Sequence, residues 1–187
     1  MNLTREEARH RSEIIKVERY HVRIDVRGAD ADGATHFTSN TRVRFSTTEP
    51  DTFLDLLDGE IESVIVNGEE IEPEYDGSRI QLHGLHTHRE NLVIVTAKLP
   101  YQHTGQGLHR FVDPADGKVY LYTHFEAADS RRMYSVFEQP DLKAHVDFDV
   151  IAPSDWRVAS NQVHEDIREE EDGLLHDFAL TPRMSTY

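Results

Sequence analysis

A strict alternation of apolar and polar residues, beginning just after Glu18, is the sequence feature that most constrains the fold. The apolar residues here are Tyr20, Val22, Ile24 and Val26. They alternate with the polar residues Arg19, His21, Arg23 and Asp25. Because successive side chains of a β-strand point to opposite faces, this period of two predicts a strand with one buried face. The alternation returns at Phe37, Thr41, Val43 and Phe45, which predicts a second strand.

Turn residues separate further apolar segments along the rest of the chain. Asn67-Gly68 and Asp172-Gly173 are expected to form two tight hairpin turns, since Asn-Gly and Asp-Gly tolerate the positive φ that such turns need. Strands are predicted on both sides of these turns, at 61–66, 69–75, 165–171 and 174–180, and also at 80–85, 91–99, 119–125, 145–151 and 157–160. Strands that recur every ~8–12 residues predict an all-β fold, a curved antiparallel β-sandwich or saddle.

One short helix is predicted before the first strand, over Thr4 to Val17. Thr4 suits the N-cap position, and Glu7 follows at the spacing of a capping box. Glu6 and Glu7 also place negative charge at the positive end of the helix dipole. We therefore expect a single domain, with an N-terminal helix over residues 1–17 and a β-sandwich over residues 18–187.

The composition excludes several classes of function. The chain has 187 residues and no cysteine, which excludes disulfides, a Cys-ligated metal and a Cys nucleophile. Its 20 Lys and Arg against 35 Asp and Glu give a net charge of −15, which argues against a nucleic-acid partner. No run of ~18 apolar residues predicts a membrane span, and the polar first residues do not form a signal peptide, so we expect a cytoplasmic protein.

Histidines could in principle supply a metal site. Of the 12 histidines, His83, His86 and His88 lie closest together, and His86 and His88 would share one face of a strand. Gly84, however, is typical of a loop, where exposed imidazoles are the simpler interpretation. The zinc-protease motif H-E-x-x-H is absent, because the one His-Glu pair, His164-Glu165, is followed by Arg168 in the position of the second His. We expect no metal ligand in this chain.

The most unusual segment runs from Leu121 to Ala144, where a predicted strand leads directly into a charged loop. Glu126 lies just after the strand, and Asp129, Arg131 and Arg132 follow. A carboxylate at the end of a buried strand is held rigidly and could bind a cation such as a substrate ammonium. Alternatively, Glu126 pairs with Arg131 or Arg132 and only holds the loop. Residue chemistry alone favours this second interpretation, because structural ion pairs are common.

This segment resembles the N-terminal domain of the aminopeptidase N family of zinc metallopeptidases. The family pattern contains Phe-Glu-x-x-Asp-Ala-Arg-Arg and, further on, Asp-Glu-Pro-x-x-Lys-Ala. Here the corresponding residues are Phe125-Glu126-Ala127-Ala128-Asp129-Ser130-Arg131-Arg132, then Glu138-Gln139-Pro140 and Lys143-Ala144. The first strand at Glu18-Arg19-Tyr20-His21-Val22, Ser160-Asn161 and the exit segment from Thr181 to Tyr187 are also similar. The resemblance thus covers nearly the whole chain.

The resemblance implies roles for particular residues. Glu126 corresponds to the acidic residue of this domain that binds the free α-amino group of a peptide substrate. His124 stands where the family has a Gln that lines the first side-chain pocket, and this departure changes the chemistry of that pocket. Asp129, Arg131 and Arg132 correspond to a structural pair network that holds the loop.

The resemblance also implies what these residues do not supply. The zinc ligands and the catalytic residues of the family lie in a catalytic domain beyond the exit segment, so no catalytic residue is expected here. We therefore expect a separated N-terminal domain that is inactive alone. Its partners would be its own catalytic domain and peptide substrates, and zinc would be bound only in the full-length enzyme.

Two alternatives remain from residue patterns alone. A non-enzymatic ligand-binding or adhesion-like β-sandwich has the same composition and strand spacing. A stand-alone zinc-binding protein would use His83, His86 and His88.

Overall fold

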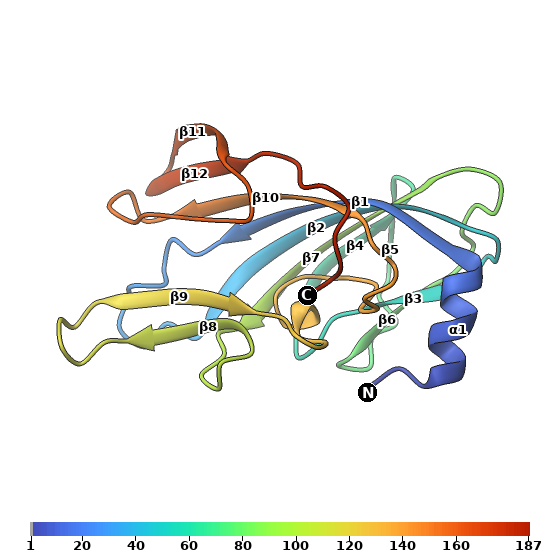
Figure 1. The fold of residues 1–187 in the computed structure, drawn as a ribbon, viewed down its shortest axis with the longest axis horizontal. Helices are drawn as coiled ribbons and strands as arrows, with labels where there is room; N and C mark the ends of the chain where they lie inside the picture. Colours follow the sequence, from blue (N-terminus) through green and yellow to red (C-terminus); the bar gives the residue numbers. More distant parts are fainter. Residues whose placement is uncertain (1) are drawn as a thin grey trace.

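An eight-stranded sheet forms the body of the structure, a computed structural model that describes residues 2–187 (Figure 1). In spatial order its strands are β11 (His164–Glu170), β12 (Gly173–Phe178), β10 (His145–Ala152), β1 (Ile15–Asp25), β2 (His36–Thr47), β7 (Asn91–Pro100), β4 (Glu60–Val66) and β5 (Glu69–Ile71). The predicted all-β fold is confirmed. The sheet is not purely antiparallel, however, because β1 and β10 pair in parallel. A period of two reports burial and not strand direction, so the sequence pattern could not reveal this pair.

Two small sheets lie on the same side of the large sheet (Figure 1). One pairs β3 (Thr52–Asp55) with β6 (Arg79–Leu82), and the other is a hairpin of β8 (Gly107–Val112) and β9 (Val119–His124). Leu54 and Ile80 of the first small sheet are fully buried in the same apolar cluster as Val22 and Val43 of the large sheet. This packing makes the fold sandwich-like.

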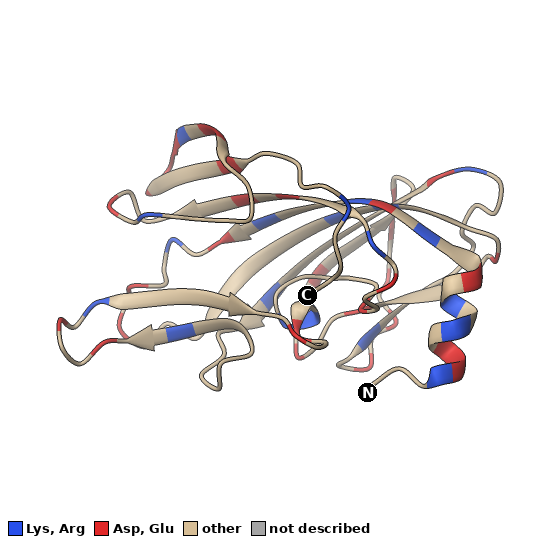
Figure 2. Cartoon of the chain, in the orientation of Figure 1, with Lys and Arg blue, Asp and Glu red and all other residues tan. Residues whose placement is uncertain are grey.

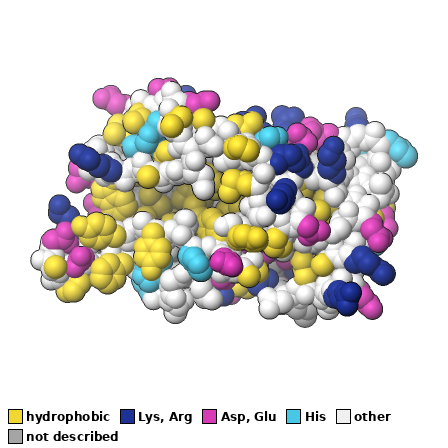
Figure 3. Space-filling model, viewed as in Figure 1, with side chains coloured by type: hydrophobic (Ala, Val, Ile, Leu, Met, Phe, Trp, Pro, Cys, Tyr) yellow, Lys and Arg dark blue, Asp and Glu magenta, His cyan; other side chains and the backbone are white. Residues whose placement is uncertain are grey.

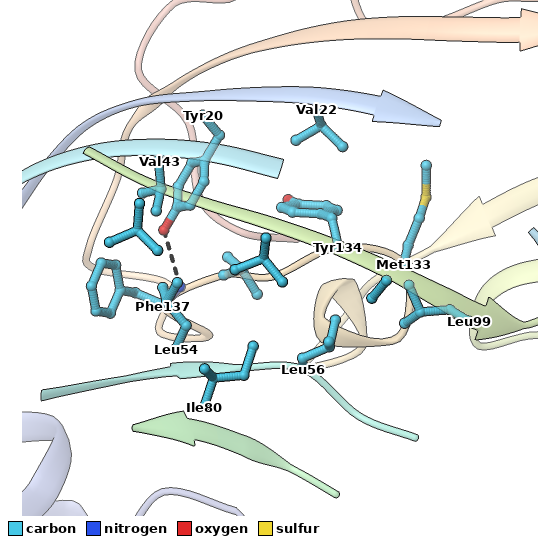
Figure 4. Packing of buried hydrophobic residues seen from close by; sticks show 14 of the residues in the cluster. Tyr20, Val22, Val43, Leu54, Leu56, Ile80, Leu99, Met133, Tyr134 and Phe137 are labelled. Atoms are coloured by element: carbon cyan, nitrogen blue, oxygen red, sulfur yellow. Dashed lines mark hydrogen bonds between the residues drawn. The ribbon is translucent and has the colours of Figure 1, made fainter. Parts of the chain in front are cut away.

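A non-strand segment, Met133 to Phe137, fills the space between the large sheet and the β3–β6 sheet (Figure 4). The Phe137 ring packs edge-on against Phe45 of β2, with ring centres 4.9 Å apart. The Phe137 N–H donates a hydrogen bond of 3.0 Å to the Tyr20 hydroxyl. The core therefore includes an irregular segment whose backbone polar groups need partners from the strands around it.

The helix α1 (Arg5–Ile14) has the predicted capping box: the Glu7 N–H donates to Thr4 Oγ1, and the Thr4 N–H donates to the Glu7 carboxylate. The predicted end at Val17 is wrong, since β1 begins at Ile15. A β-bulge between Val17 and Arg19 interrupts the alternation, so the first residues of the strand are out of phase with the rest. In the described part of the chain, no helix has the length and apolar character needed to cross a membrane.

Other local predictions also differ from the structure. The strand predicted over 69–75 ends at Ile71, and the one predicted over 80–85 ends at Leu82. The last hairpin turns at residues 171–172, where Asp172 has φ +60°, and Gly173 is already in β12. A Cβ on Gly173 would lie 2.5 Å from the carbonyl oxygen of Ala152, so this glycine serves a close backbone approach. The strand predicted over 157–160 is absent, because this segment runs as an unpaired loop after Pro153. The turn at Asn67-Gly68 is confirmed, with φ of +54° and +93°.

The face of β1 turned away from the core carries a ladder of ion pairs with β10. The His21 ring forms hydrogen bonds with Asp147 and Asp149, whereas Arg19 pairs with Asp147 at 2.6 Å and Arg23 with Asp149 at 2.9 Å. Hydrogen bonding to Asp147, and then to Asp149, raises the pKa of His21 to about 9. These pairs link the two strands that run in parallel.

The ladder predicts a pH dependence of stability. Because the pKa of His21 is raised by folding, its contribution is fully present below pH ~6.5 and is lost as the pH rises through about 9. Between pH 6 and pH 10, the difference in unfolding free energy between the wild type and His21→Gln should shrink by about 1–3 kcal/mol. Urea denaturation of both proteins at each pH measures this difference. His88→Gln, at an exposed loop ring, is the control, and parallel pH curves for wild type and His21→Gln would contradict the prediction.

The approach of β8 to the short 3₁₀ helix η1 (Ser130–Arg132) generates a second prediction. Gly107, with φ +58°, leaves no room for a side chain, since a Cβ would lie 2.6 Å from the Cβ of Arg132. Gly107→Ala should therefore lower the free energy of unfolding by about 1–3 kcal/mol more than Gly84→Ala. Gly84 has a similar φ of +65° but open space around it, so the pair separates the clash from backbone strain. If urea denaturation gave the same loss of unfolding free energy for Gly107→Ala and Gly84→Ala, the clash with Arg132 would contribute nothing and the prediction would be wrong.

Candidate functional site

A hollow of about 990 Å³, lined by both apolar and polar residues, lies between the β8–β9 hairpin and the large sheet. Figure 3 shows it as a recess with hydrophobic side chains at its floor. Its apolar lining includes Ile24 of β1, Val26 just after it, Val146, Phe148 and Val150 of β10, Leu108, Val119 and Leu121 of the hairpin, and Trp156, Val158, Met184 and Tyr187. The hollow is therefore bordered by the segment where a strand was wrongly predicted and by the last residues of the chain.

The hairpin that borders the hollow exposes large apolar side chains. Phe111, Tyr120 and Tyr122 are each close to half exposed. The strand β9 itself contains no charged residue, in contrast to α1, which carries many of both signs (Figure 2). The sequence analysis missed the strand β8 and this exposed aromatic face, because alternation alone would assign such residues to a core.

His124 and Glu126 both line the hollow at the end of β9. His124 is the last residue of the strand, Glu126 follows two residues later, and both side chains are exposed. Within residues 2–187, the Glu126 carboxylate has no hydrogen-bond or ion-pair partner, and so the internal pairing with Arg131 or Arg132 is not made. A free carboxylate at the border of a hollow can bind a cationic group.

The loop that carries Glu126 is closed by its own hydrogen bonds. The Asp129 N–H donates to the carbonyl oxygen of Phe125 at 2.9 Å, which bends the chain around Glu126, and the Glu126–Ala127 peptide bond is cis. Arg132 Nε donates to Asp129 Oδ1 at 2.7 Å, and the same guanidinium lies 3.7 Å from Asp58. Asp129 and Arg132, three and six residues after Glu126, are thus brought together.

Arg131 contributes to the loop in a different way. Its buried guanidinium donates from Nε to the carbonyl oxygen of Ala128 at 2.9 Å and from Nη2 to Asn2 Oδ1 at 2.7 Å. Its carbonyl oxygen accepts from the Leu57 N–H at 2.8 Å. Arg131 therefore ties the loop to the N-terminal residues and to the segment after β3.

Two buried carboxylates near this loop did not emerge from the sequence analysis. Asp55 accepts a hydrogen bond of 3.1 Å from Arg11 Nη1, and Glu138 accepts two hydrogen bonds from Ser130 and Arg131. Both residues are almost fully buried. The signal for Glu138 was its place in the unusual segment directly after the buried apolar residues Val136 and Phe137, but its partners are set by the tertiary fold.

The histidine cluster that could have supplied a metal site does not converge. His83 forms ion pairs with Asp51 at 3.0 Å and Glu74 at 3.6 Å, and His86 Nε2 accepts a hydrogen bond from Arg89. Among residues 2–187, no group of three or more His, Asp or Glu side chains is placed to hold a metal ion. The donor set of the described chain therefore does not fit a catalytic zinc ion.

Comparison with known proteins places this geometry in context. Residues 18–187 match the family model described as the peptidase M1 N-terminal domain. The chain is similar over its whole length to aminopeptidase N of Streptomyces lividans, with 42% identity over 190 residues that cover 21% of that protein. It is also similar to probable aminopeptidase 1 of Saccharolobus solfataricus, with 30% identity over 177 residues, 91% of this chain and 21% of that protein.

A more distant relative is aminopeptidase N of Rattus norvegicus, with 31% identity over 80 residues, 41% of this chain and 8% of that protein. The chain spans about a fifth of the length of the two microbial relatives. The resemblance identified from the segment around Glu126 is confirmed. By the extent of the family match, this chain belongs to the peptidase M1 N-terminal domain family.

Proposed function

We propose that this chain is the substrate-anchoring domain of a zinc aminopeptidase and that Glu126 binds the free α-ammonium group of a peptide. The observation that carries the proposal is the free Glu126 carboxylate at the border of the hollow, held on a hydrogen-bonded loop at the end of β9. The names of the relatives, which are aminopeptidases, support it.

The chemistry of Glu126 suits this task. An aminopeptidase must distinguish a free N-terminus from an internal amide. A carboxylate pairs with an ammonium group through a charge-assisted hydrogen bond, whereas an internal amide would leave the carboxylate desolvated and without a cation. A rigid support increases this discrimination, because a carboxylate that is already in position loses little entropy on binding.

His124 is proposed to line the first side-chain pocket. It lies two residues before Glu126 and borders the same hollow, so the two side chains are near enough to contact neighbouring parts of one substrate residue. An imidazole can donate and accept hydrogen bonds and gains a positive charge when protonated.

The proposed partner of the hollow is the catalytic domain of the same enzyme. The hollow is lined by partly buried apolar side chains, and exposed aromatic residues such as Tyr120 and Tyr122 border it. An exposed apolar area of this kind is typical of an interface. Tyr187 also lines the hollow, so a polypeptide that continues beyond it would start at this surface.

The zinc ion and the residues that act on the scissile bond are proposed to belong to that catalytic domain, because this sequence contains no H-E-x-x-H. Bound zinc would activate the attacking water. The contribution of this chain would be to bind and orient the substrate. The cytoplasmic location stays a prediction. The alternative of a non-enzymatic ligand-binding or adhesion-like module has no specific observation in its favour.

The proposed function predicts that the 187-residue chain is inactive alone. Without zinc ligands, the purified chain with added zinc should release no p-nitroaniline from leucine p-nitroanilide above a buffer blank. The full gene product that carries this domain is the positive control in the same assay. Release that is abolished by a chelator and that follows the chain through purification would contradict the prediction.

The proposed function also makes a prediction for Glu126 in the full gene product. Glu126→Gln keeps the size of the side chain but removes its charge, so kcat/KM for leucine p-nitroanilide should fall about 10–100-fold, as expected for a hydrogen bond to a charged group. Zinc content, measured by atomic absorption, should not change. Glu169→Gln, an exposed position on β11, is the matched control. An unaltered kcat/KM for Glu126→Gln would refute the assignment.

A further inference from the structure

A buried carboxylate, Glu138, lies beneath the loop that carries Glu126. The Glu138 side chain belongs to a residue that is only 5% exposed. One oxygen, Oε2, accepts a hydrogen bond of 2.5 Å from the Ser130 hydroxyl and one of 2.8 Å from the Arg131 N–H. Ser130 and Arg131 are the first two residues of η1, so this single oxygen holds the beginning of that 3₁₀ helix.

Glu138 is itself held from the other side by the core. Its N–H donates to Asp55 Oδ2 at 3.1 Å, and the same carboxylate oxygen accepts from Arg11 Nη1 at 3.1 Å. Asp55 lies on β3 and Arg11 on α1, and each is almost fully buried. Glu138 therefore connects η1 to two elements that cannot move without disturbing the core.

The Glu138 carboxylate is costly to bury, which indicates that its hydrogen bonds matter. Burial raises the pKa of Glu138, and the bonds from Ser130 and Arg131 act against that rise. Its other oxygen, Oε1, is buried and makes no hydrogen bond of normal geometry within residues 2–187, although the nearby Thr186 side chain also acts to lower the pKa of Glu138. A buried carboxylate that uses one oxygen for two donors is tolerated only where those two bonds are strong.

A short path of hydrogen bonds leads from η1 to Glu126. Arg131 Nε donates to the carbonyl oxygen of Ala128, and the Asp129 N–H donates to the carbonyl oxygen of Phe125. These bonds enclose Glu126 in a loop whose far end is fixed at Ser130 and Arg131. The Leu57 N–H, which donates to the Arg131 carbonyl oxygen, is a second tie to the same end. On the N–H side of η1, the Arg131 N–H donates to Glu138 Oε2, and the Arg132 N–H donates to the Asp129 carbonyl oxygen within the loop itself. Among these two acceptors, Glu138 is the one that lies outside the loop.

We propose that Glu138 is a positioning residue, which fixes η1 and through it the place of the Glu126 carboxylate at the border of the hollow. This inference rests on the proposed function of Glu126. A binding group must be held to within ~0.5 Å to keep its full effect, so loss of the tie beneath the loop should weaken substrate binding although Glu138 itself never touches substrate.

The test uses the full gene product and four variants: Glu138→Gln, Ser130→Ala, Glu126→Gln and the double variant Glu126→Gln with Glu138→Gln. Glu138→Gln keeps the shape but weakens the acceptor. Ser130→Ala removes one donor by deleting a single oxygen, which preserves a foldable variant if Glu138→Gln does not fold. The two readouts are kcat/KM for leucine p-nitroanilide and hydrogen exchange of the segment 125–133, followed by mass spectrometry.

We expect exchange in 125–133 to become at least ~10-fold faster in Glu138→Gln and in Ser130→Ala, since the first weakens the charged acceptor for η1 and the second removes one of its donors. We expect kcat/KM to fall about 5–20-fold in Glu138→Gln, and less than about twofold further when Glu138→Gln is added to Glu126→Gln, because the two residues act through one group. The control for general destabilisation is Val64→Ala, which creates a cavity at a fully buried position of β4, outside the segment 125–133. It should change kcat/KM less than about twofold.

The outcomes separate the two proposals. If Glu126→Gln is impaired but Glu138→Gln and Ser130→Ala behave as wild type, the positioning role is wrong and the function of Glu126 stands. Losses that multiply in the double variant, or an equal loss in Val64→Ala, also overturn the positioning role. If Glu126→Gln itself has wild-type kcat/KM, the proposed function is wrong and the inference falls with it.

Discussion

The need to satisfy the backbone of a buried, non-strand segment is the constraint on which the rest of this structure depends. The segment from Ser135 to Glu138 passes between the two sheets, where no water can replace a missing hydrogen bond. Its four N–H groups find partners on three strands: Thr41 Oγ1 on β2, the Tyr20 hydroxyl on β1, and both the carbonyl oxygen and the carboxylate of Asp55 on β3. The side chains of β1, β2 and β3 therefore do more than fill the core. They fix the course of the segment.

The candidate site depends on this buried segment. Glu138, at its end, holds η1, and η1 is the far end of the loop in which Glu126 lies. On the other side of the loop, β9 supplies a regular strand up to His124. Glu126 is thus placed between a strand and a core-anchored 3₁₀ helix, although its own side chain remains free. In this way the loop fixes the position of a surface carboxylate that forms no internal ion pair.

The hollow and the charged surface lie on opposite faces of the same strands. Lys, Arg, Asp and Glu are frequent on α1 and on the outer face of β1, where His21 pairs with Asp147 and Asp149 (Figure 2). The side of β1 and β10 that faces the hairpin is apolar instead, with Ile24, Phe148 and Val150 at the hollow. Alternation along a strand produces both faces at once, because every second side chain belongs to each. The net charge of −15 is therefore compatible with a large apolar recess.

Local patterns in the sequence determined much of this protein. Alternation at Tyr20, Val22 and Ile24 set the buried face of β1, Thr4 and Glu7 set the start of α1, and Asn67-Gly68 set a hairpin, because each depends on residues that are close in sequence. The segment around Glu126 identified the family. Only the tertiary structure decided the parallel pairing of β1 with β10, the bulge in β1 between Val17 and Arg19, and the contact of Glu138 with Ser130 and Asp55. These features join residues far apart in the chain, and their geometry exists only after the sheets have packed around the buried segment.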